Sequence, residues 1–141
     1  MTAQARASLS GWTGEWAGSV DSLRGSLLAG SRRTDSSGRS KACCSGQAET
    51  STLLEVAAHT DLFLFDLKQM DSKLHEHYTG VGNEQILKNL ETLSLNGASI
   101  RIRFPLVATV NDSVENVEAM GRFLSDLGTI EHVDLLVYHD L

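Results

Sequence analysis

The sequence lacks the features that mark several protein classes. No apolar run in its 141 residues approaches the roughly 18 that a membrane-spanning helix needs. The first residues contain no charged segment followed by an apolar stretch, so no secretory signal is expected. The 12 basic residues are outnumbered by 18 acidic ones, and the net charge of −6 argues against a nucleic acid or an anionic membrane as the main partner. These absences predict a soluble, cytoplasmic protein.

Metal-ligating residues are equally scarce. The only two cysteines, Cys43 and Cys44, are adjacent, and one such pair builds neither a disulfide framework nor a four-thiolate metal site. His75, Glu76 and His77 resemble a metal pair, but without a third ligand they are expected to form a solvated turn. The sequence therefore predicts no metal site.

The composition changes near residue 50. Residues 1–50 contain 24 Gly, Ser and Ala and carry a net charge of +2 (6 basic, 4 acidic), whereas residues 51–141 carry −8 (6 basic, 14 acidic). No large apolar residue occurs from Gly30 to Ala48, and such a stretch cannot offset its ordering entropy. We expect residues 1–50 to be disordered, apart from one frayed helix near 12–28, and residues 51–141 to fold.

The second half alternates helical and strand patterns. Apolar periodicity, with capping boxes at Thr52–Glu55 and Asp112–Glu115, predicts helices at 52–59, 86–93 and 117–127. Short apolar or alternating runs predict strands at 61–68, 100–104 and 132–139, the second ending at Pro105. This α-β-α-β-α-β order predicts an α/β fold, a parallel sheet whose crossover helices lie on one side. The sheet stops at Leu141, directly after a strand, as though the chain were truncated.

Charged residues cluster where the predicted strands end. Ligands of parallel α/β folds bind beyond the carboxyl ends of the strands, and these ends carry Asp66, Lys68, Arg103, Tyr138 and His139. Two cations and an acid at one rim suit a small zwitterion. The alternative is structural: Asp66 pairs with Lys68 or Arg103 merely to neutralise charge at the sheet end. The glycines of Gly80-Val81-Gly82 open the next helix as a phosphate loop would, but no third glycine follows.

The amino-acid sequence of residues 52–141 resembles that of a known family. Four segments occur in the family's order: DLFLFDLKQMD, HYTGVGNEQILKNL, IRIRFPLVATVNDSVENVEAMGRFL and VDLLVYHDL. They resemble the C-terminal half of the glycyl-radical-enzyme activating proteins, which are radical S-adenosylmethionine enzymes of the pyruvate formate-lyase activating type. The resemblance implies that residues 51–141 are the C-terminal half of a partial (β/α)6 radical-SAM barrel.

The resemblance also implies particular binding residues. The family's Asp-x-Lys segment helps to bind S-adenosylmethionine and matches Asp66, Leu67 and Lys68. Its Leu-x-Tyr-His element supplies another cofactor contact and matches His139. Its arginine near the cofactor and the partner's glycine loop matches Arg103. No catalytic residue is assigned.

The family's chemistry is cleavage of S-adenosylmethionine to a 5′-deoxyadenosyl radical, which takes a hydrogen atom from a glycine of a partner. The resemblance thus implies a glycyl-radical enzyme as partner, such as a formate acetyltransferase-like protein. The family also holds a [4Fe–4S] cluster on a C-x3-C-x2-C signature. That signature and the family's Gly-Gly-Glu-Pro segment are missing here. The chain is therefore expected to be incomplete and inactive as written, through a frameshift, a mis-called start or a gene fragment.

Two other functions stay open at this point. One is a non-catalytic α/β remnant or interaction module that retains the sheet without the cluster. The other is an ordinary barrel enzyme in which Lys68 forms a Schiff base, as in aldolases. Trapping of a substrate at Lys68 by borohydride would favour the second of these.

Overall fold

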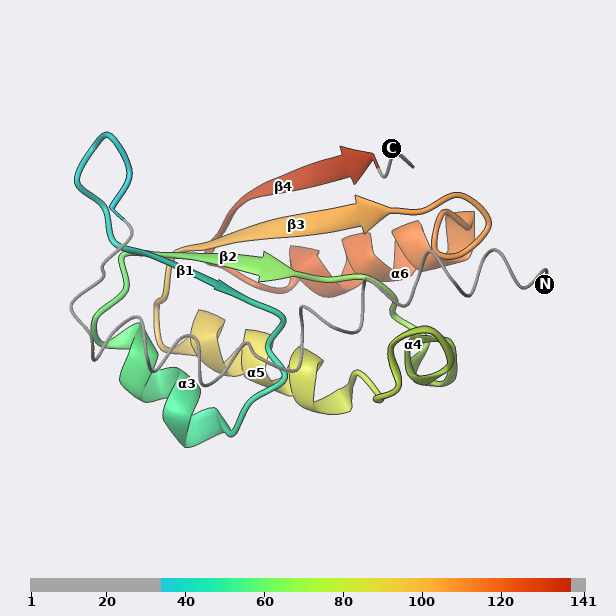
Figure 1. Cartoon of the computed structure of the whole chain (residues 1–141), viewed down its shortest axis with the longest axis horizontal. Helices are drawn as coiled ribbons and strands as arrows, with labels where there is room; N and C mark the ends of the chain where they lie inside the picture. The colour runs from blue at the N-terminus through green and yellow to red at the C-terminus, as the bar shows by residue number, and fades with distance from the viewer. Residues whose placement is uncertain (1–33, 138–141) are drawn as a thin grey trace.

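A computed structural model describes residues 34–137 of the chain (Figure 1). The elements follow in the order β1 (Lys41–Cys44), α3 (Thr50–Ala57), β2 (Leu62–Asp66), α4 (Ser72–Thr79), α5 (Glu84–Leu95), β3 (Ile100–Leu106), α6 (Val114–Ser125) and β4 (Ile130–Val137). The four strands form one parallel sheet in the order β1-β2-β3-β4. The predicted α/β class is confirmed, and the sheet has one more strand than expected.

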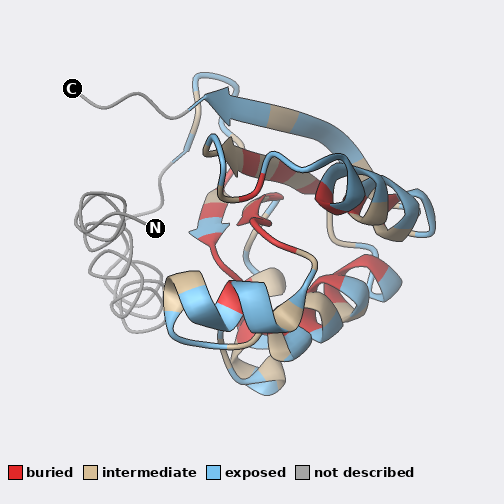
Figure 2. Ribbon diagram, turned by 90° about the vertical axis from the view of Figure 1, so that its right-hand side faces the viewer, coloured by how far each residue is buried: buried red, intermediate tan, exposed pale blue. Residues whose placement is uncertain are grey.

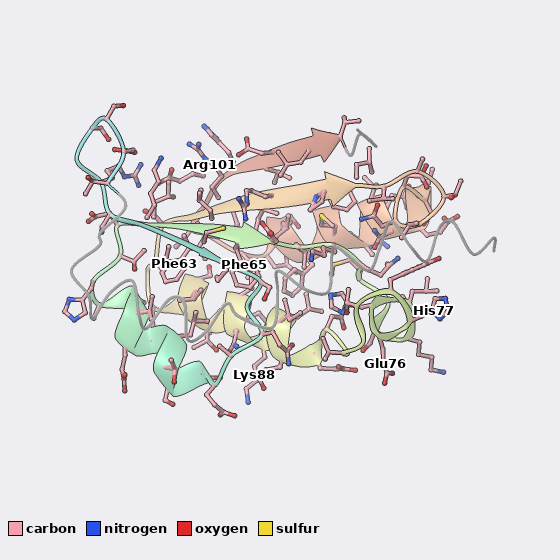
Figure 3. All side chains as sticks on the ribbon, in the orientation of Figure 1. Phe63, Phe65, Glu76, His77, Lys88 and Arg101 are labelled. Atoms are coloured by element: carbon pink, nitrogen blue, oxygen red, sulfur yellow. The ribbon has the colours of Figure 1, made fainter. Side chains whose placement is uncertain are left out.

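The helices lie on one face of the sheet, as predicted. Figure 1 shows α3, α5 and α6 beneath the strands, with α4 beyond their carboxyl ends. Phe63 and Phe65 of β2 point toward these helices (Figure 3), as do alternate residues of β3. This helix face is the main core, because its large side chains are at most 1% exposed: Phe63, Phe65, Leu67, Ile100, Ile102 and Phe104.

The other face of the sheet carries polar side chains on β3 and at the carboxyl end of β2, next to the apolar Leu62 and Leu64 of β2. Successive residues of a strand point to opposite sides, so Arg101 and Arg103 alternate with the buried Ile100, Ile102 and Phe104. Figure 3 shows Arg101 directed away from the helices. We call this side of the sheet, with Cys43, Asp66, Lys68, Arg101 and Arg103, the polar face. The predicted alternation of β3 is thereby confirmed.

The first strand corrects an expectation. Lys41–Cys44 lies in the segment that composition marks as disordered, yet it pairs along its whole length with Leu62–Phe65. The expectation of disorder is therefore wrong for these four residues. Ala42 and Cys44 are small, but both are buried against the core, where a free cysteine behaves as a small apolar residue. Most of the burial comes from neighbouring elements, which a local composition count does not register.

Helix α4 is a second correction. The sequence around His75, Glu76 and His77 was expected to be a solvated turn, whereas it forms a helix in which His75 is buried. Asp71 caps its start by accepting from the backbone N–H of Leu74 at 2.9 Å. Gly80 ends it at a φ of 88°, so this glycine closes α4 rather than opening the next helix as a phosphate loop.

Several predicted boundaries also move. Helix α3 begins at Thr50, and Glu49, its N-cap, makes no side-chain capping bond, so the capping box at Thr52 is wrong. The cap of α6 is Ser113, one residue later than predicted, and its side chain accepts from the N–H of Asn116. Strand β3 continues past Pro105 to Leu106 because the missing N–H removes a single donor from the ladder.

Some expectations fall outside the described residues. They are the frayed helix near 12–28 and the last two residues of the third predicted strand, Tyr138 and His139. Within residues 34–137, no helix is both long enough and apolar enough to cross a membrane. Figure 2 shows the buried residues gathered between the sheet and its helices, with β4 largely exposed.

Candidate functional site

The carboxyl ends of β2 and β3 bring the predicted charges together. Asp66 and Arg103 are opposite each other in the parallel register. The Nε of Arg103 donates to the Oδ1 of Asp66 at 2.5 Å, and the carboxylate is 9% exposed. Lys68, two residues beyond Asp66, is 5% exposed. The structure places Asp66, Lys68 and Arg103 at the same edge of the sheet, and the Asp66–Arg103 ion pair is one of the two pairings that the structural alternative named.

A fourth side chain joins this cluster from β1. The Nη2 of Arg103 donates to the Sγ of Cys43 at 2.7 Å. Arg103 on β3 therefore bonds to the carboxylate of Asp66 on the adjacent strand β2 and reaches across it to the thiol of Cys43 on β1. Cys43 is not among the site residues predicted from the sequence; its alternation with the buried Ala42 and Cys44 is the signal that would have placed it on the polar face. We call Cys43, Asp66, Lys68 and Arg103 the rim cluster.

Burial changes the protonation of the rim cluster. Burial lowers the pKa of Lys68 to about 7; the charge of Arg103 acts in the same direction, and that of Asp66 opposes it. Burial likewise raises the pKa of Asp66, against the opposing effects of Arg103 and Lys68. Near neutral pH, Lys68 is therefore poised between its neutral and charged forms. An anion bound beside it would favour the charged form.

Helix α4 places a histidine close to Lys68. Burial lowers the pKa of His75, and the charge of Lys68 lowers it further, whereas the contact with the carbonyl of Val81 raises it. His75 Nδ1 and that carbonyl oxygen are 2.7 Å apart. The ring thus borders the rim cluster with one nitrogen engaged by the backbone. Sequence reasoning missed this placement because it assigned the segment to solvent.

One predicted site residue, Leu67, has its side chain away from the rim, and another, His139, lies outside the described residues. The side chain of Leu67 packs in the core on the helix face, and its backbone N–H donates to the carbonyl of Arg103 at 3.0 Å. Any contact of Leu67 with a ligand is therefore through its backbone. His139 lies beyond the described residues, so its assignment stays a prediction.

The donor set does not fit an iron–sulfur cluster. The chain has two cysteines, one fewer than the three thiolates of the family signature. Cys44 is buried on the helix face, and burial raises the pKa of its thiol to about 12, which disfavours the thiolate that binds metal. Among residues 34–137, no group of three or more His, Cys, Asp or Glu side chains is arranged to hold a metal ion.

The rim cluster does fit a small zwitterionic ligand. Lys68 and Arg103 offer cations for a carboxylate, and Asp66 offers an acceptor for an ammonium group. All three come from adjacent parallel strands at the carboxyl edge, where ligands of such sheets bind. The amino acid end of S-adenosylmethionine has this chemistry.

Curated proteins with related sequences share one kind of activity. The chain is 38% identical over 99 residues to the choline trimethylamine-lyase activating enzyme of Oleidesulfovibrio alaskensis, which covers 68% of this chain and 32% of that protein. It is 44% identical over 98 residues to the trans-4-hydroxy-L-proline dehydratase activating enzyme of Clostridioides difficile, with the same two coverages. The chain thus spans about a third of the length of these relatives. No protein-family model matches it.

Solved structures agree with this relationship. A domain of the pyruvate-formate lyase-activating enzyme from Bacteroides vulgatus matches with a TM-score of 0.70 and 32% identity, over 86% of this chain and 71% of that one. Streptococcus suis SuiB, solved with S-adenosylmethionine, matches in fold with a TM-score of 0.61 at 20% identity, over 73% of this chain and 24% of SuiB. The fold is consistent with a partial radical-SAM barrel. From the sequence identities and the shared fold, the chain belongs to the family of glycyl-radical-enzyme activating enzymes of the pyruvate formate-lyase activating type.

Proposed function

We propose that β1 and residues 51–141 form the part of a radical S-adenosylmethionine enzyme that holds the cofactor for glycyl-radical generation on a partner enzyme. The observation that carries the proposal is the meeting of Asp66, Lys68 and Arg103 at the carboxyl edge of a parallel sheet. The family membership of the chain supports it. The relatives activate a lyase and a dehydratase, which is consistent with the proposed partner class, a glycyl-radical enzyme.

The proposal gives each of the binding residues a role. Lys68 and Asp66 orient the amino acid end of S-adenosylmethionine, the backbone of Leu67 holds the strand exit, and His139 contacts the adenosyl part. Arg103 is already anchored by Asp66 and Cys43, and its remaining exposed edge faces the approaching glycine loop. When bound, S-adenosylmethionine would supply the 5′-deoxyadenosyl group; its release as the radical that takes the glycine hydrogen, with methionine leaving, requires one electron, which the two cysteines of this chain hold no cluster to donate. The chain's own share is binding, orientation and exclusion of water.

The protonation of Lys68 gives the proposal a specific signature. The pKa of the free amine is about 7, so a large fraction is neutral near neutral pH. A carboxylate bound beside the amine stabilises the charged form and raises that pKa. Binding should therefore be accompanied by proton uptake, which is measurable as a dependence of the binding enthalpy on the ionisation enthalpy of the buffer.

Isothermal titration of the full chain with S-adenosylmethionine and S-adenosylhomocysteine tests the site. We expect weak binding, in the high micromolar range, because without the Gly-Gly-Glu-Pro segment and a cluster the methionyl group loses several charge-assisted hydrogen bonds. Lys68→Ala and His139→Ala should weaken binding further and Lys68→Ala should abolish proton uptake at pH 7. The matched control is Lys88→Ala, since Lys88 is exposed on α5 (Figure 3).

Two results would contradict this site. Low-micromolar binding that is indifferent to both Lys68→Ala and His139→Ala would show that other residues hold the ligand. Equal weakening by Lys88→Ala would show a general charge effect.

A second candidate function has its own observation. The two cysteines cannot supply the thiolates of a [4Fe–4S] cluster, which favours a non-catalytic interaction module that retains the family's sheet. Anaerobic reconstitution with iron and sulfide distinguishes the two. The non-catalytic reading expects no stable visible absorption and no reducible cluster, whereas a stable cluster at stoichiometric iron would favour the catalytic one.

A further inference from the structure

Three buried asparagines surround the segment that follows β2. Asn83, Asn111 and Asn116 are 2%, 2% and 5% exposed. They come from separate parts of the chain: the start of α5, the loop after β3 and the first turn of α6. Their side-chain amides all hydrogen-bond to the backbone, and several of these bonds end on the carbonyl oxygens of Lys68 and of Gln69, the residue after it.

Asn111 ties the exits of β2 and β3 together. Its Nδ2 donates to the carbonyl of Lys68 at 2.9 Å and to the carbonyl of Pro105 at 2.8 Å. Its Oδ1 accepts from the N–H of Val107 at 2.8 Å. All three of these hydrogen bonds are to backbone atoms. This one side chain therefore fixes the Lys68 backbone relative to β3, the strand that carries Arg103.

Asn116 and Asn83 hold the next two residues of the same segment. The Oδ1 of Asn116 accepts from the N–H of Met70 at 2.8 Å, and its Nδ2 donates to the carbonyl of Asn111 at 2.8 Å. The Nδ2 of Asn83 donates to the carbonyls of Gln69 and Met70 at 2.8 and 2.9 Å. The segment is thereby fixed on both sides of Gln69, with Asn111 holding Lys68, the member of the rim cluster that belongs to this segment.

We propose that Asn111 is a positioning residue for the rim cluster, which it serves by setting the backbone of Lys68 against the end of β3, with Asn116 supporting Asn111. This inference rests on the proposed function and deepens it. The Nδ2 of Asn116 also reaches the Lys68 carbonyl, at 3.5 Å, so loss of the Asn111 amide leaves that buried carbonyl with the long contact alone. A buried carbonyl without a good donor is costly, so it turns toward water and carries the lysine amine with it. The amine then loses both its burial and its fixed distance from Asp66 and Arg103.

The test measures the position of Lys68 apart from overall stability. Competitive acylation of the full chain with trace acetic anhydride, read per lysine by mass spectrometry across pH, gives the titration of Lys68, with the exposed Lys73 and Lys88 as internal references. Titration with S-adenosylmethionine gives the affinity. We expect Asn111→Ala to move the midpoint of Lys68 labelling upward by at least one pH unit and to weaken binding about tenfold. Asn116→Ala should cause a smaller change of the same sign.

Asn89→Ala is the matched control. Asn89 is equally buried and its Nδ2 also donates to two backbone carbonyls, of Gly46 and Ala48, at 2.7 and 2.8 Å. It should cost comparable stability while leaving the Lys68 midpoint unchanged. A purely structural role for Asn111 predicts that both variants behave alike, and that result overturns the proposal.

The remaining outcomes are also decisive. If the unsubstituted chain binds no S-adenosylmethionine, the proposed function fails, while the shift of the Lys68 midpoint still supports or refutes the role of Asn111. If Asn111→Ala does not fold, Asn116→Ala carries the comparison. If neither folds although Asn89→Ala does, these asparagines are stability elements and the proposal is overturned.

Discussion

The two faces of the same four strands have opposite characters. On the helix face, Phe63, Phe65 and Ile102 are fully buried in an apolar core. On the polar face, the positions that alternate with them include Asp66, Arg103 and, beyond the strand end, Lys68. Both sets are largely removed from water, but the first gains stability by burial, while the second includes charged groups whose desolvation is unfavourable.

The difference shows how an alternating strand sequence can place stabilising side chains on one face of a sheet and the candidate binding residues on the other. Apolar side chains on the helix face need only volume and shape, and three helices complete their environment. The charged groups of the polar face need partners, and Arg103 reaches both Asp66 and Cys43 to provide them. A buried lysine with a pKa of about 7 is a destabilising choice for a structural position. Perturbed pKa values of this kind cluster at functional sites.

The largest expected effect is on the helix face. Phe65→Ala should lower the free energy of unfolding by about 3–5 kcal/mol, because it removes a fully buried aromatic ring and leaves a cavity. Urea denaturation of the full chain, followed by circular dichroism, measures it. The control is Leu135→Ala on β4. Leu135 is 63% exposed, so its truncation should change the free energy of unfolding by less than about 0.5 kcal/mol. Equal losses would mean that the helix face is not the main core.

The second effect has the opposite sign and depends on pH. The pKa of Lys68 is about 7 in the fold against 10.5 when unfolded, so below pH 7 the folded state holds a buried charge that the unfolded state solvates. Lys68→Met should therefore stabilise the protein at pH 6, by an amount of the order of 2 kcal/mol after allowance for relaxation. The gain should shrink as the pH rises from 7 toward 10.5, where both states of the parent are neutral. Urea midpoints at several pH values, with Lys88→Met as control, measure it; a gain that is constant with pH would contradict the buried charge.

What the sequence predicted well was local geometry. Alternation alone placed Arg101 and Arg103 opposite Ile100, Ile102 and Phe104, because the period of a strand is fixed by its backbone. The position of Asp66 and Arg103 at the same edge of the sheet followed from the parallel order of their strands. In the same way, the apolar stripes of α5 and α6 gave the two long helices to within a few residues.

What the sequence did not predict depends on contacts between distant segments. Strand β1 has no large apolar residue, and its order comes from pairing with β2. Helix α4 has little apolar periodicity and is defined by its end residues, Asp71 and Gly80. Arg103 contacts Cys43 across 60 residues of sequence, and Asn111 contacts Lys68 across 43. No single-sequence pattern encodes such a distance.

The third effect tests the pairing on the polar face. Arg103→Gln leaves the Asp66 carboxylate buried without its cation and should cost about 1–2 kcal/mol, less than a fully buried pair because Arg103 is half-buried. Burial already raises the pKa of Asp66, and loss of Arg103 raises it further. The loss of stability should thus be greatest at pH 8 and diminish as the pH falls and the carboxyl group takes up a proton. The double variant with Asp66→Asn, measured by urea denaturation at pH 8, should recover most of it; a double variant no more stable than Arg103→Gln would show that the Cys43 contact or packing dominates.

The smallest effect distinguishes the rim cluster from the rest of the polar face. Arg101 belongs to the same strand and face as Arg103, but its Nε lies 4.0 Å from the Oδ2 of Asp134, and both side chains are partly exposed. An ion pair in such a position contributes little, since solvent screens it and the long side chain loses freedom. Asp134→Asn should therefore change the free energy of unfolding by less than about 0.5 kcal/mol, with the change vanishing in 1 M salt. A loss as large as that of Arg103→Gln would mean that charge is stabilising across the whole polar face, and that the rim cluster is not set apart by its burial.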